Sequence, residues 1–508
     1  MSLRVYNTLT RQKEAFVPRD PGRVGVYVCG VTPYAQSHVG HARPSVVWDA
    51  IRNYLEYSGY QVRLVQNFTD VDDKIIARSA EAGIPALELS ARYAADYLQT
   101  MDNLGVRPAD VYVKVSEHME DIIRMIQGLV DGGLAYPLGG DVYYDVTKFA
   151  DYGKLSGRSL EDLRAGARIE VDERKRNPGD FALWKAAKPG EPAWPSPWGP
   201  GRPGWHIECS AMSLRYLGNG FDFHGGGSDL IFPHHENEIA QSEGYTGQPP
   251  FVHYWLHNGL VNLSAEKMSK SLGNVVSIDS LLERFQPGVL HMFLLTTHYR
   301  GPLDFDEDAV KEAETGWERL ANTRRNLLEA LREDGQAPRS AAPGWGRDGA
   351  VRSAALKREL DAMAASPQTS DAAEREALEA LLASRRRLEE AMDDDFNTAL
   401  ALGAFFDLSR ALNTYRSQRR PESGTALLDL TYRWYALLGD MFGLFAGVKD
   451  EPQQGGMGEV AMQILLELRQ EARQQKNWAL ADRIRDRLAE HGVVIEDTAA
   501  GPKWKLKS

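Results

Sequence analysis

One strand–helix–strand unit near the N-terminus constrains the fold of this chain more than any other feature. Residues 24–29 form a continuous run of mostly β-branched side chains, as expected for a strand buried on both faces. An apolar face at helical spacing follows over residues 45–57, with Pro44 in the first turn of that helix. A second strand is expected over residues 61–67. This order predicts a parallel, Rossmann-like α/β sheet.

Two polar segments lie where such a sheet binds ligands, beyond the carboxyl ends of its strands. Cys29 and Thr69 follow the two predicted strands directly. His38-Val-Gly-His41 stands between the first strand and its helix, and Gly40 lets a ligand approach the backbone. Free N–H groups at a helix start favour phosphate, and the imidazoles could stabilise its developing charge. Surface loop histidines are the alternative interpretation.

A second phosphate-handling motif is Lys267-Met-Ser-Lys-Ser271, followed by Leu-Gly-Asn274. Two lysines flank small hydroxyl residues on what we expect to be a mobile loop. Such a loop can close over a polyphosphate, where Lys270 would neutralise developing charge. A solvated basic loop is the alternative. The two motifs together indicate a phosphate-handling α/β enzyme.

Composition excludes several classes of protein. The chain has 508 residues and only two cysteines, which excludes a disulfide scaffold and indicates a reducing, cytoplasmic setting. We find no apolar run of the roughly 18 residues that a membrane helix needs, so no membrane association is expected. The net charge of −12 argues weakly against nucleic-acid binding. The C-terminal fifty residues are close to neutral, which softens that objection.

The two cysteines also belong to a candidate metal site. Cys209 lies in Gly-Trp-His-Ile-Glu-Cys-Ser-Ala-Met, and His234 and Glu238 are four residues apart on a helix expected to start at Pro233. With Cys29 they offer two thiolates, an imidazole and a carboxylate, a plausible set of zinc ligands. Because the two cysteines are 180 residues apart, spacing alone favours buried structural cysteines over a metal site.

The two phosphate motifs, together with the opening strand–helix–strand unit, resemble the paired signatures of class I aminoacyl-tRNA synthetases. Longer stretches are similar to one family within that class, the cysteinyl-tRNA synthetases. These stretches are Val-Tyr-Val-Cys-Gly at 26–30, Asn67-Phe-Thr-Asp-Val-Asp-Asp-Lys74, Gly204-Trp-His-Ile-Glu-Cys-Ser-Ala-Met212, Phe223-His-Gly-Gly-Gly-Ser-Asp229 and Phe232-Pro-His-His-Glu-Asn-Glu-Ile-Ala-Gln241. The resemblance covers nearly the whole chain.

The resemblance implies activation of L-cysteine by ATP, with Mg²⁺, to cysteinyl-adenylate and pyrophosphate, and transfer to tRNA(Cys). It also implies one zinc ion per chain that binds the substrate thiol directly. The residues that it assigns fall into three groups. The metal ligands are Cys29, Cys209, His234 and Glu238; the ATP-binding and catalytic residues are His38, Gly40, His41, Gly227, Asp229, Lys267 and Lys270; the cysteine pocket is Thr69, Trp205 and His224.

The rest of the chain is expected to form further domains. The catalytic domain would span 1–120 and 201–305, separated by a connective insertion over 121–200. A helical bundle would cover 306–450 and contact the tRNA, and a small anticodon-binding module would cover 459–508. The Ala-rich, charged segment 335–375 is expected to be a solvated face or a flexible insertion. Aromatic, guanidinium and carboxylate groups that suit single-stranded bases are present in this module. They are Arg473, Trp478, Asp482 and Asp497. A capping helix with a solvated face is the alternative for this module.

Cys29-Gly-Val-Thr-Pro-Tyr34 departs from the family pattern, in which proline often follows that glycine directly. The local sequence resembles a sister enzyme, the cysteine–glucosaminyl-inositol ligase of mycothiol synthesis, which joins cysteine to an amino sugar. That ligase needs no anticodon-reading module, whereas this chain is expected to carry one. A catalytically silent RNA-binding or zinc-regulatory protein is a third hypothesis, against which the two intact phosphate motifs argue. We expect a monomer.

Overall fold

The computed structural model describes residues 2–159, 174–263, 266–267, 276–336, 345–346, 348–365, 371–419, 425–448, 456–475, 477–491, 493–498 and 501–506. The chain divides into two compact units, residues 1–448 and 449–508. No helix in the described ranges combines the length and the apolar character that crossing a membrane requires.

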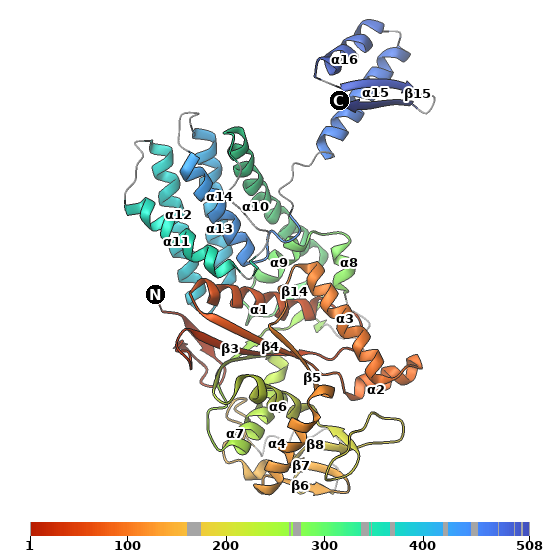
Figure 1. The fold of residues 1–508 in the computed structure, drawn as a ribbon, viewed down its shortest axis with the longest axis vertical. Helices are drawn as coiled ribbons and strands as arrows, with labels where there is room; N and C mark the ends of the chain where they lie inside the picture. The colour runs from red at the N-terminus through yellow and green to blue at the C-terminus, as the bar shows by residue number, and fades with distance from the viewer. Residues whose placement is uncertain are drawn as a thin grey trace. The chain divides into compact units, whose positions relative to one another are not determined.

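A five-stranded sheet with all strands parallel organises the first unit, in the order β11-β10-β3-β4-β5. Its strands are β3 (Arg23–Val31), β4 (Gln61–Phe68), β5 (Val111–Lys114), β10 (Phe221–Gly227) and β11 (Val252–Asn258). The expected strand–helix–strand unit is present as β3, α1 (Val39–Tyr57) and β4. The parallel α/β architecture is therefore confirmed. Figure 1 shows this sheet below the helical region of the same unit.

Helix α1 begins earlier than the sequence pattern predicts. Its cap is His38, and Pro44 lies inside the helix rather than in its first turn. His41 and Ala42 already donate their amides to the His38 carbonyl, so helical bonding starts before the proline. Pro44 removes only the bond to the Gly40 carbonyl, a small loss near a helix end. The consequence is that the whole His38–His41 motif forms the start of α1.

A separate four-stranded antiparallel sheet is inserted between β5 and β10. Its strands are β6 (Ala135–Leu138), β7 (Asp141–Tyr144), β8 (Phe181–Ala186) and β9 (Gly201–Pro203), and α4 (Met119–Asp131) precedes them. Helix α6 (Trp205–Leu217) then returns the chain to the parallel sheet. Tyr144, Leu183 and Trp184 of the inserted sheet are fully buried and share one apolar core with α4 and α6.

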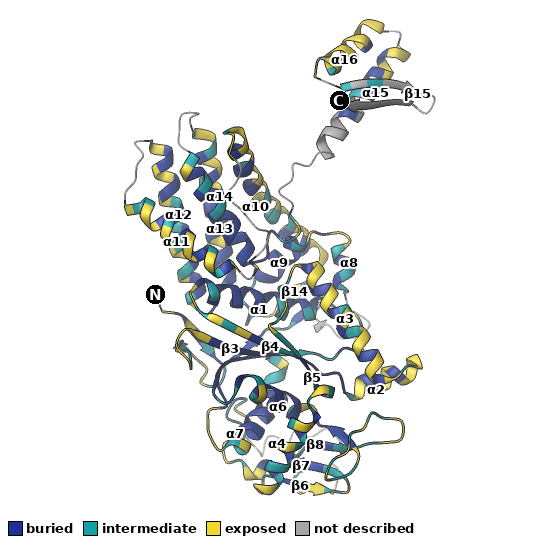
Figure 2. Cartoon of the chain, viewed as in Figure 1, coloured by how far each residue is buried: buried dark blue, intermediate teal, exposed yellow. Residues whose placement is uncertain are grey.

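Most of the chain after the parallel sheet is helical and shares one buried apolar core with α1 (Figure 2). The helices are α8 (Ile278–Leu282), α9 (Pro287–Leu295), α10 (Glu307–Glu333), α11 (Gly349–Ala365), α12 (Ala372–Asp393), α13 (Thr398–Gln418) and α14 (Thr425–Met441). Of these, α9, α11 and α14 contact α1. We expected residues 335–375 to form a solvated or flexible insertion. For α11 this expectation is wrong, because Ser353, Leu356 and Leu360 are buried in the core between α1 and α14.

The second unit contains two helices and a two-stranded antiparallel sheet. These are α15 (Gly456–Gln474), α16 (Trp478–Glu490), β15 (Val493–Thr498) and β16 (Gly501–Leu506). Asn477 caps α16 by accepting a hydrogen bond from the Leu480 amide. Met462, Leu466, Ala472 and Ala481 supply buried side chains of this unit.

Candidate active site

Four potential metal ligands meet at the carboxyl end of β3. Cys29 ends its buried part, Cys209 lies on the buried face of α6, His234 lies in the π-helical turn η4 (Ile231–His235), and Glu238 lies in α7 (Glu236–Thr246). One ligand atom from each residue lies within 4.8 Å of every other. The structure thus brings together four donors that lie in three distant parts of the sequence.

The spacing within this cluster fits a tetrahedral zinc ion. The two sulfur atoms are 3.9 Å apart, and His234 Nε2 is 3.0 Å from Glu238 Oε1. Zinc–sulfur bonds of about 2.3 Å in a tetrahedron give a sulfur–sulfur edge of about 3.8 Å. A sulfur–sulfur bond would be about 2.0 Å long, so the thiols are reduced. Two thiols, an imidazole and a carboxylate form a donor set of the kind that zinc prefers.

Around His234 the helical backbone starts after Phe232, as predicted, but its first turn is π-helical. Phe232 has extended backbone angles, as the residue before a proline usually does, and α7 begins only at Glu236. His234 and Glu238 therefore meet from a π-helical turn and an α-helix in succession. Gln241 ties this region to α6, because its amide donates to Ser210 Oγ and to the His206 carbonyl.

Electrostatics within the cluster favour charged ligands. Burial opposes ionisation of Glu238, but His224 and His234 outweigh it and lower its pKa to about 2. Burial likewise disfavours protonated His234, yet Glu238 and Cys209 raise its pKa to about 10. Contact with the Cys29 thiol lowers the pKa of Cys209 to about 6. The cluster therefore provides a carboxylate and one acidic thiol for a cation, whereas His234 would have to lose its proton, and so would Cys29, because burial raises the pKa of its thiol. Binding of a metal ion here would release protons.

A second ring of histidines surrounds these donors, and sequence reasoning missed part of it. His235 Nε2 lies 3.3 Å from Cys29 Sγ, and its Nδ1 lies 2.7 Å from His257 Nε2. Cys29, His224, His235 and Glu238 form an overlapping set of possible ligands. The adjacent histidines at 234 and 235 were the available signal, whereas nothing in the local sequence pointed to His257.

The three residues assigned to the cysteine pocket take different positions. Trp205 is 40% exposed and stacks on His234, with ring centroids 4.3 Å apart. Thr69 is buried beside Asn67, whose amide donates to Thr69 Oγ1. His224 is fully buried, and its Nε2 is 2.9 Å from Glu238 Oε2. His224 thus lies behind the carboxylate, where it can orient Glu238.

A cleft opens in front of the cluster, and Cys29 forms part of its wall. The phosphate motif at the start of α1 lines it through His38, Gly40 and His41, whose two imidazoles stack with centroids 3.7 Å apart. Gly227 and Asp229, after β10, line the opposite side. A Cβ at Gly227 would lie 2.5 Å from Asp229 Oδ1, so a larger residue here would displace this carboxylate.

Of the second phosphate motif, residues 267–271, the structure describes only Lys267. Lys267 lies in β13 (Glu266–Lys267), which pairs with β12 (Val261–Leu263), while Lys270 lies outside the described residues. Beyond the motif, the Val39 amide donates to the Val276 carbonyl and the Ile278 amide to the Ser37 carbonyl. The chain on the far side of the motif is thus anchored to the start of α1.

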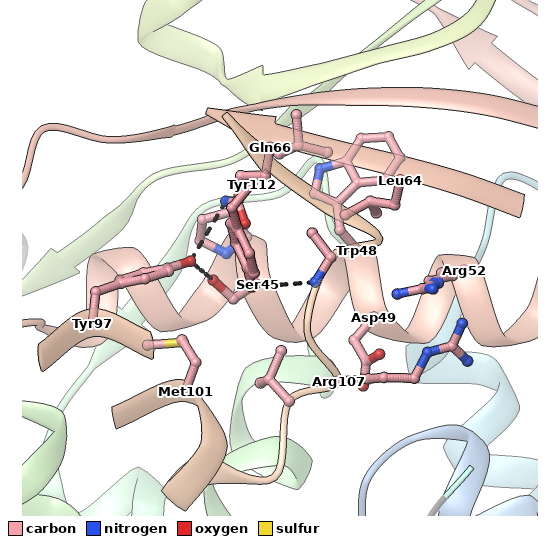
Figure 3. A pocket seen from close by; sticks show the side chains of 14 residues that line it. Ser45, Trp48, Asp49, Arg52, Leu64, Gln66, Tyr97, Met101, Arg107 and Tyr112 are labelled. Carbon is pink, nitrogen blue, oxygen red and sulfur yellow. Dashed lines mark hydrogen bonds between the residues drawn. The ribbon is translucent and has the colours of Figure 1, made fainter. Parts of the chain in front are cut away.

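A smaller pocket shares Ser45 and Tyr97 with the cleft, and its wall includes apolar side chains such as Leu64 and Met101 (Figure 3). The hydroxyl oxygens of Ser45 and Tyr97 are 2.9 Å apart. Asp49 lines the inner part of this pocket with Arg52 and Arg107. Burial raises the pKa of Asp49 to about 6, although the neighbouring guanidinium groups act in the opposite direction.

The residues assigned to anticodon binding lie in the second unit. Trp478 is 56% exposed at the first turn of α16, and Arg473 is exposed near the end of α15. Asp482 is exposed and forms an ion pair with Arg485, with an N–O distance of 3.0 Å. Asp497 lies in β15 opposite Pro502. An exposed indole and an exposed guanidinium are compatible with base stacking.

The sequence is similar to family models and to known proteins over nearly its whole length. The family model for the class I (C) tRNA synthetase catalytic domain matches residues 15–315, the DALR domain model matches 387–446, and the model for the cysteinyl-tRNA ligase anticodon binding domain matches 460–504. A cysteine–tRNA ligase of Heliobacterium modesticaldum is 52% identical over 99% of this chain and 100% of its own length. One of Pelotomaculum thermopropionicum is 51% identical over 99% of each chain.

Solved structures support the fold. The methionyl-tRNA synthetase of Mycobacterium tuberculosis, in complex with methionyl-adenylate, superposes with a TM-score of 0.58 and covers 84% of this chain and 92% of its own. The two sequences are 18% identical, so this similarity concerns the architecture alone. Helices that follow a parallel catalytic sheet are thus common to both chains.

Proposed function

The chain belongs to the cysteine–tRNA ligase family, and from this premise we propose that a zinc ion held by Cys29, Cys209, His234 and Glu238 selects the amino acid. The enzyme activates cysteine with ATP, releasing pyrophosphate, and transfers the cysteinyl group to tRNA. The cysteine–glucosaminyl-inositol ligase hypothesis is not favoured, because residues 460–504 match an anticodon-binding domain. The family assignment likewise disfavours a catalytically silent protein.

One observation carries the proposal for zinc: Cys29 belongs both to the four-donor cluster and to the wall of the cleft. A ligand in the cleft can therefore reach the metal position directly. When bound there, zinc supplies a thiophilic Lewis acid that favours a cysteine thiolate over a serine hydroxyl. A pocket without such a bond could not separate two side chains that differ only by sulfur and oxygen.

The chain's own residues position the remaining groups. We assign Trp205 and Thr69 to the walls of the amino-acid pocket, and His224 to the orientation of the Glu238 carboxylate. His38, Gly40 and His41 would face the triphosphate at the amino end of α1, where helix N–H groups and imidazoles stabilise negative charge. Gly227 and Asp229 would hold the ribose. Lys267 and Lys270 would neutralise the departing pyrophosphate.

Further parts of the proposal concern tRNA, ions and location. Trp478 and Arg473 would stack on anticodon bases of tRNA(Cys), with Asp482 and Asp497 accepting hydrogen bonds from base edges. ATP would enter with Mg²⁺. The reduced thiols, 3.9 Å apart, are compatible with a cytoplasmic enzyme. The monomeric state stays a prediction.

The experiment is ATP–pyrophosphate exchange with cysteine or serine, combined with elemental analysis for zinc. We expect one zinc per chain, exchange with cysteine, and a cysteine-to-serine ratio in kcat/KM on the order of 10⁴ or more. Cys209→Ser should lose both zinc and cysteine-dependent exchange. Ser213→Ala is the matched control, because this buried hydroxyl lies one turn further along α6 and bonds only to the Ser210 carbonyl. A Cys209→Ser enzyme with stoichiometric zinc would contradict the ligand set.

A further inference from the structure

Arg43 has an unusual environment for an arginine. It lies in α1, two residues after His41, lines the cleft, and is fully buried. Within the described ranges, each hydrogen bond that its guanidinium donates goes to a backbone carbonyl oxygen. The acceptors belong to Gly259 at 2.9 Å, Leu260 at 3.0 Å, Gly301 at 2.5 Å and His298 at 3.4 Å.

No carboxylate in the described part of the chain forms an ion pair with Arg43. Burial lowers the pKa of Arg43 to about 10, so the side chain remains charged at neutral pH. A buried charge is costly unless neighbouring dipoles compensate it. The carbonyl groups of two separate turns provide that compensation here. The position of those turns and the position of Arg43 are therefore coupled.

The two turns border the nucleotide cleft and the second phosphate motif. Residues 258–261 line the cleft and lead into β12 and β13, and thus into the motif that starts at Lys267. Residues 298–301 lead into β14 (Leu303–Phe305), which pairs with β12. The turns are in close contact, because a Cβ at Gly259 would lie 2.0 Å from the Gly301 carbonyl oxygen. Arg43 binds both from the side of α1.

The second turn is also held from the helical region. Asp395, between α12 and α13, is fully buried and accepts hydrogen bonds from Tyr299 at 2.8 Å and Arg300 at 2.7 Å. A continuous series of polar contacts, buried except at the partly exposed Arg300, therefore runs from Asp395 through residues 298–301 to Arg43. It ends at α1, which carries His38 and His41 at its start.

We propose that Arg43 is a positioning residue for ATP: it fixes the turn at residues 258–261, and the strand that enters the Lys267–Ser271 motif, relative to the histidine pair of α1. Asp395 holds the outer turn that Arg43 binds. This inference rests on the proposed role of the cleft as the ATP site. Arg43 would set the distance between the two phosphate motifs through its contacts with the chain, not through contact with the nucleotide.

Arg43→Lys tests the proposal in cysteine-dependent exchange, with active sites counted by adenylate formation. Lysine keeps the charge but has a single nitrogen that cannot span two turns. We expect kcat/KM for ATP to fall about 10- to 100-fold, mostly through KM for ATP. KM for cysteine should change less than about twofold and zinc content not at all, because Arg43 does not contact the metal cluster. Arg324→Lys, a buried arginine of α10, is the control and should leave KM for ATP unchanged.

A merely structural role for Arg43 would lower the number of active sites and leave both KM values unchanged, which would overturn the proposal. Should Arg43→Lys not fold, Gly259→Ala replaces it, since the added methyl group separates the same turns; an unchanged KM for ATP would again overturn it. Absence of cysteine-dependent exchange in the unmodified enzyme would instead refute the proposed function.

The contribution of Asp395 needs a double-mutant cycle. Asparagine tolerates the left-handed backbone of Asp395 (φ 68°) and removes the charge that holds Arg300. If Asp395 acts through Arg43, the effects of Asp395→Asn and Arg43→Lys on KM for ATP should be less than multiplicative. Fully multiplicative effects would show that the two residues act independently and would remove Asp395 from the proposal.

Discussion

Replacing His224 with phenylalanine separates two roles that this histidine could have. Its Nε2 is 2.9 Å from Glu238 Oε2, and both side chains are fully buried. Phenylalanine keeps a ring of similar size that can stack on Trp255, whose ring centroid is 4.6 Å from that of His224. The substitution thus removes one donor while largely preserving the packing.

The expected loss of zinc affinity follows from the hydrogen bond that Glu238 loses when His224 is replaced. Without the imidazole, one oxygen of a buried carboxylate has no donor from residue 224, at a cost of about 1–3 kcal/mol or more for a charged group. Loss of such a ligand-orienting partner typically weakens metal binding about 10- to 100-fold. We therefore expect zinc affinity to fall by this factor, whereas KM for cysteine in the zinc-saturated enzyme should change little.

Zinc affinity would be measured by competition with a chromophoric chelator, and KM by pyrophosphate exchange at saturating zinc. His291→Phe is the matched control, because His291 is equally buried but bonds to the carbonyls of Leu104 and Phe442. It should lower stability without affecting zinc affinity. Unchanged zinc affinity in His224→Phe, together with a raised KM for cysteine, would refute our assignment and favour direct contact with the substrate.

Three further predictions concern other parts of the chain. Asp49→Asn should stabilise the protein above pH 6 by up to about 3 kcal/mol, measured by denaturant unfolding. The raised pKa of Asp49 means that folding favours its neutral form, so the native protein loses stability as pH rises from 3.8 through about 6. If Asp49→Asn raised the free energy of unfolding as much at pH 4 as at pH 8, burial of this charge would not be the cause. Lys270→Ala should slow exchange with little change in KM for cysteine; a collapse of cysteine affinity would assign this lysine to the wrong substrate. Trp478→Ala should weaken tRNA charging by about 1–3 kcal/mol, with impaired exchange as the contrary result.

The parallel sheet could be predicted from local pattern, because strands buried on both faces and an amphipathic helix have distinct periodicities. The start of α1 could not be predicted in this way. The His38 carbonyl accepts the first helical hydrogen bonds, six residues before Pro44, where the sequence pattern placed the first turn. Helical backbone does begin after the extended Phe232, as predicted, but its first turn is π-helical and α7 itself starts at Glu236. Propensity does not reveal such local departures.

The four donors could be named together only through family resemblance, because Cys29 and Cys209 are 180 residues apart and meet through the packing of α6 on the sheet. Contacts such as His235 with His257, or Arg43 with four carbonyl groups, depend on tertiary structure and leave no local pattern. The family-like stretch 223–229 pointed to His224, but only the structure shows that its imidazole contacts Glu238.

X-ray absorption at the zinc edge tests the central claim most directly, because it counts the sulfur atoms bound to the metal. We predict two sulfur ligands, from Cys29 and Cys209, in the enzyme without substrate and three when cysteine is added, with no change on addition of serine. A sulfur count that stays at two with saturating cysteine would contradict recognition of the substrate thiol by the metal.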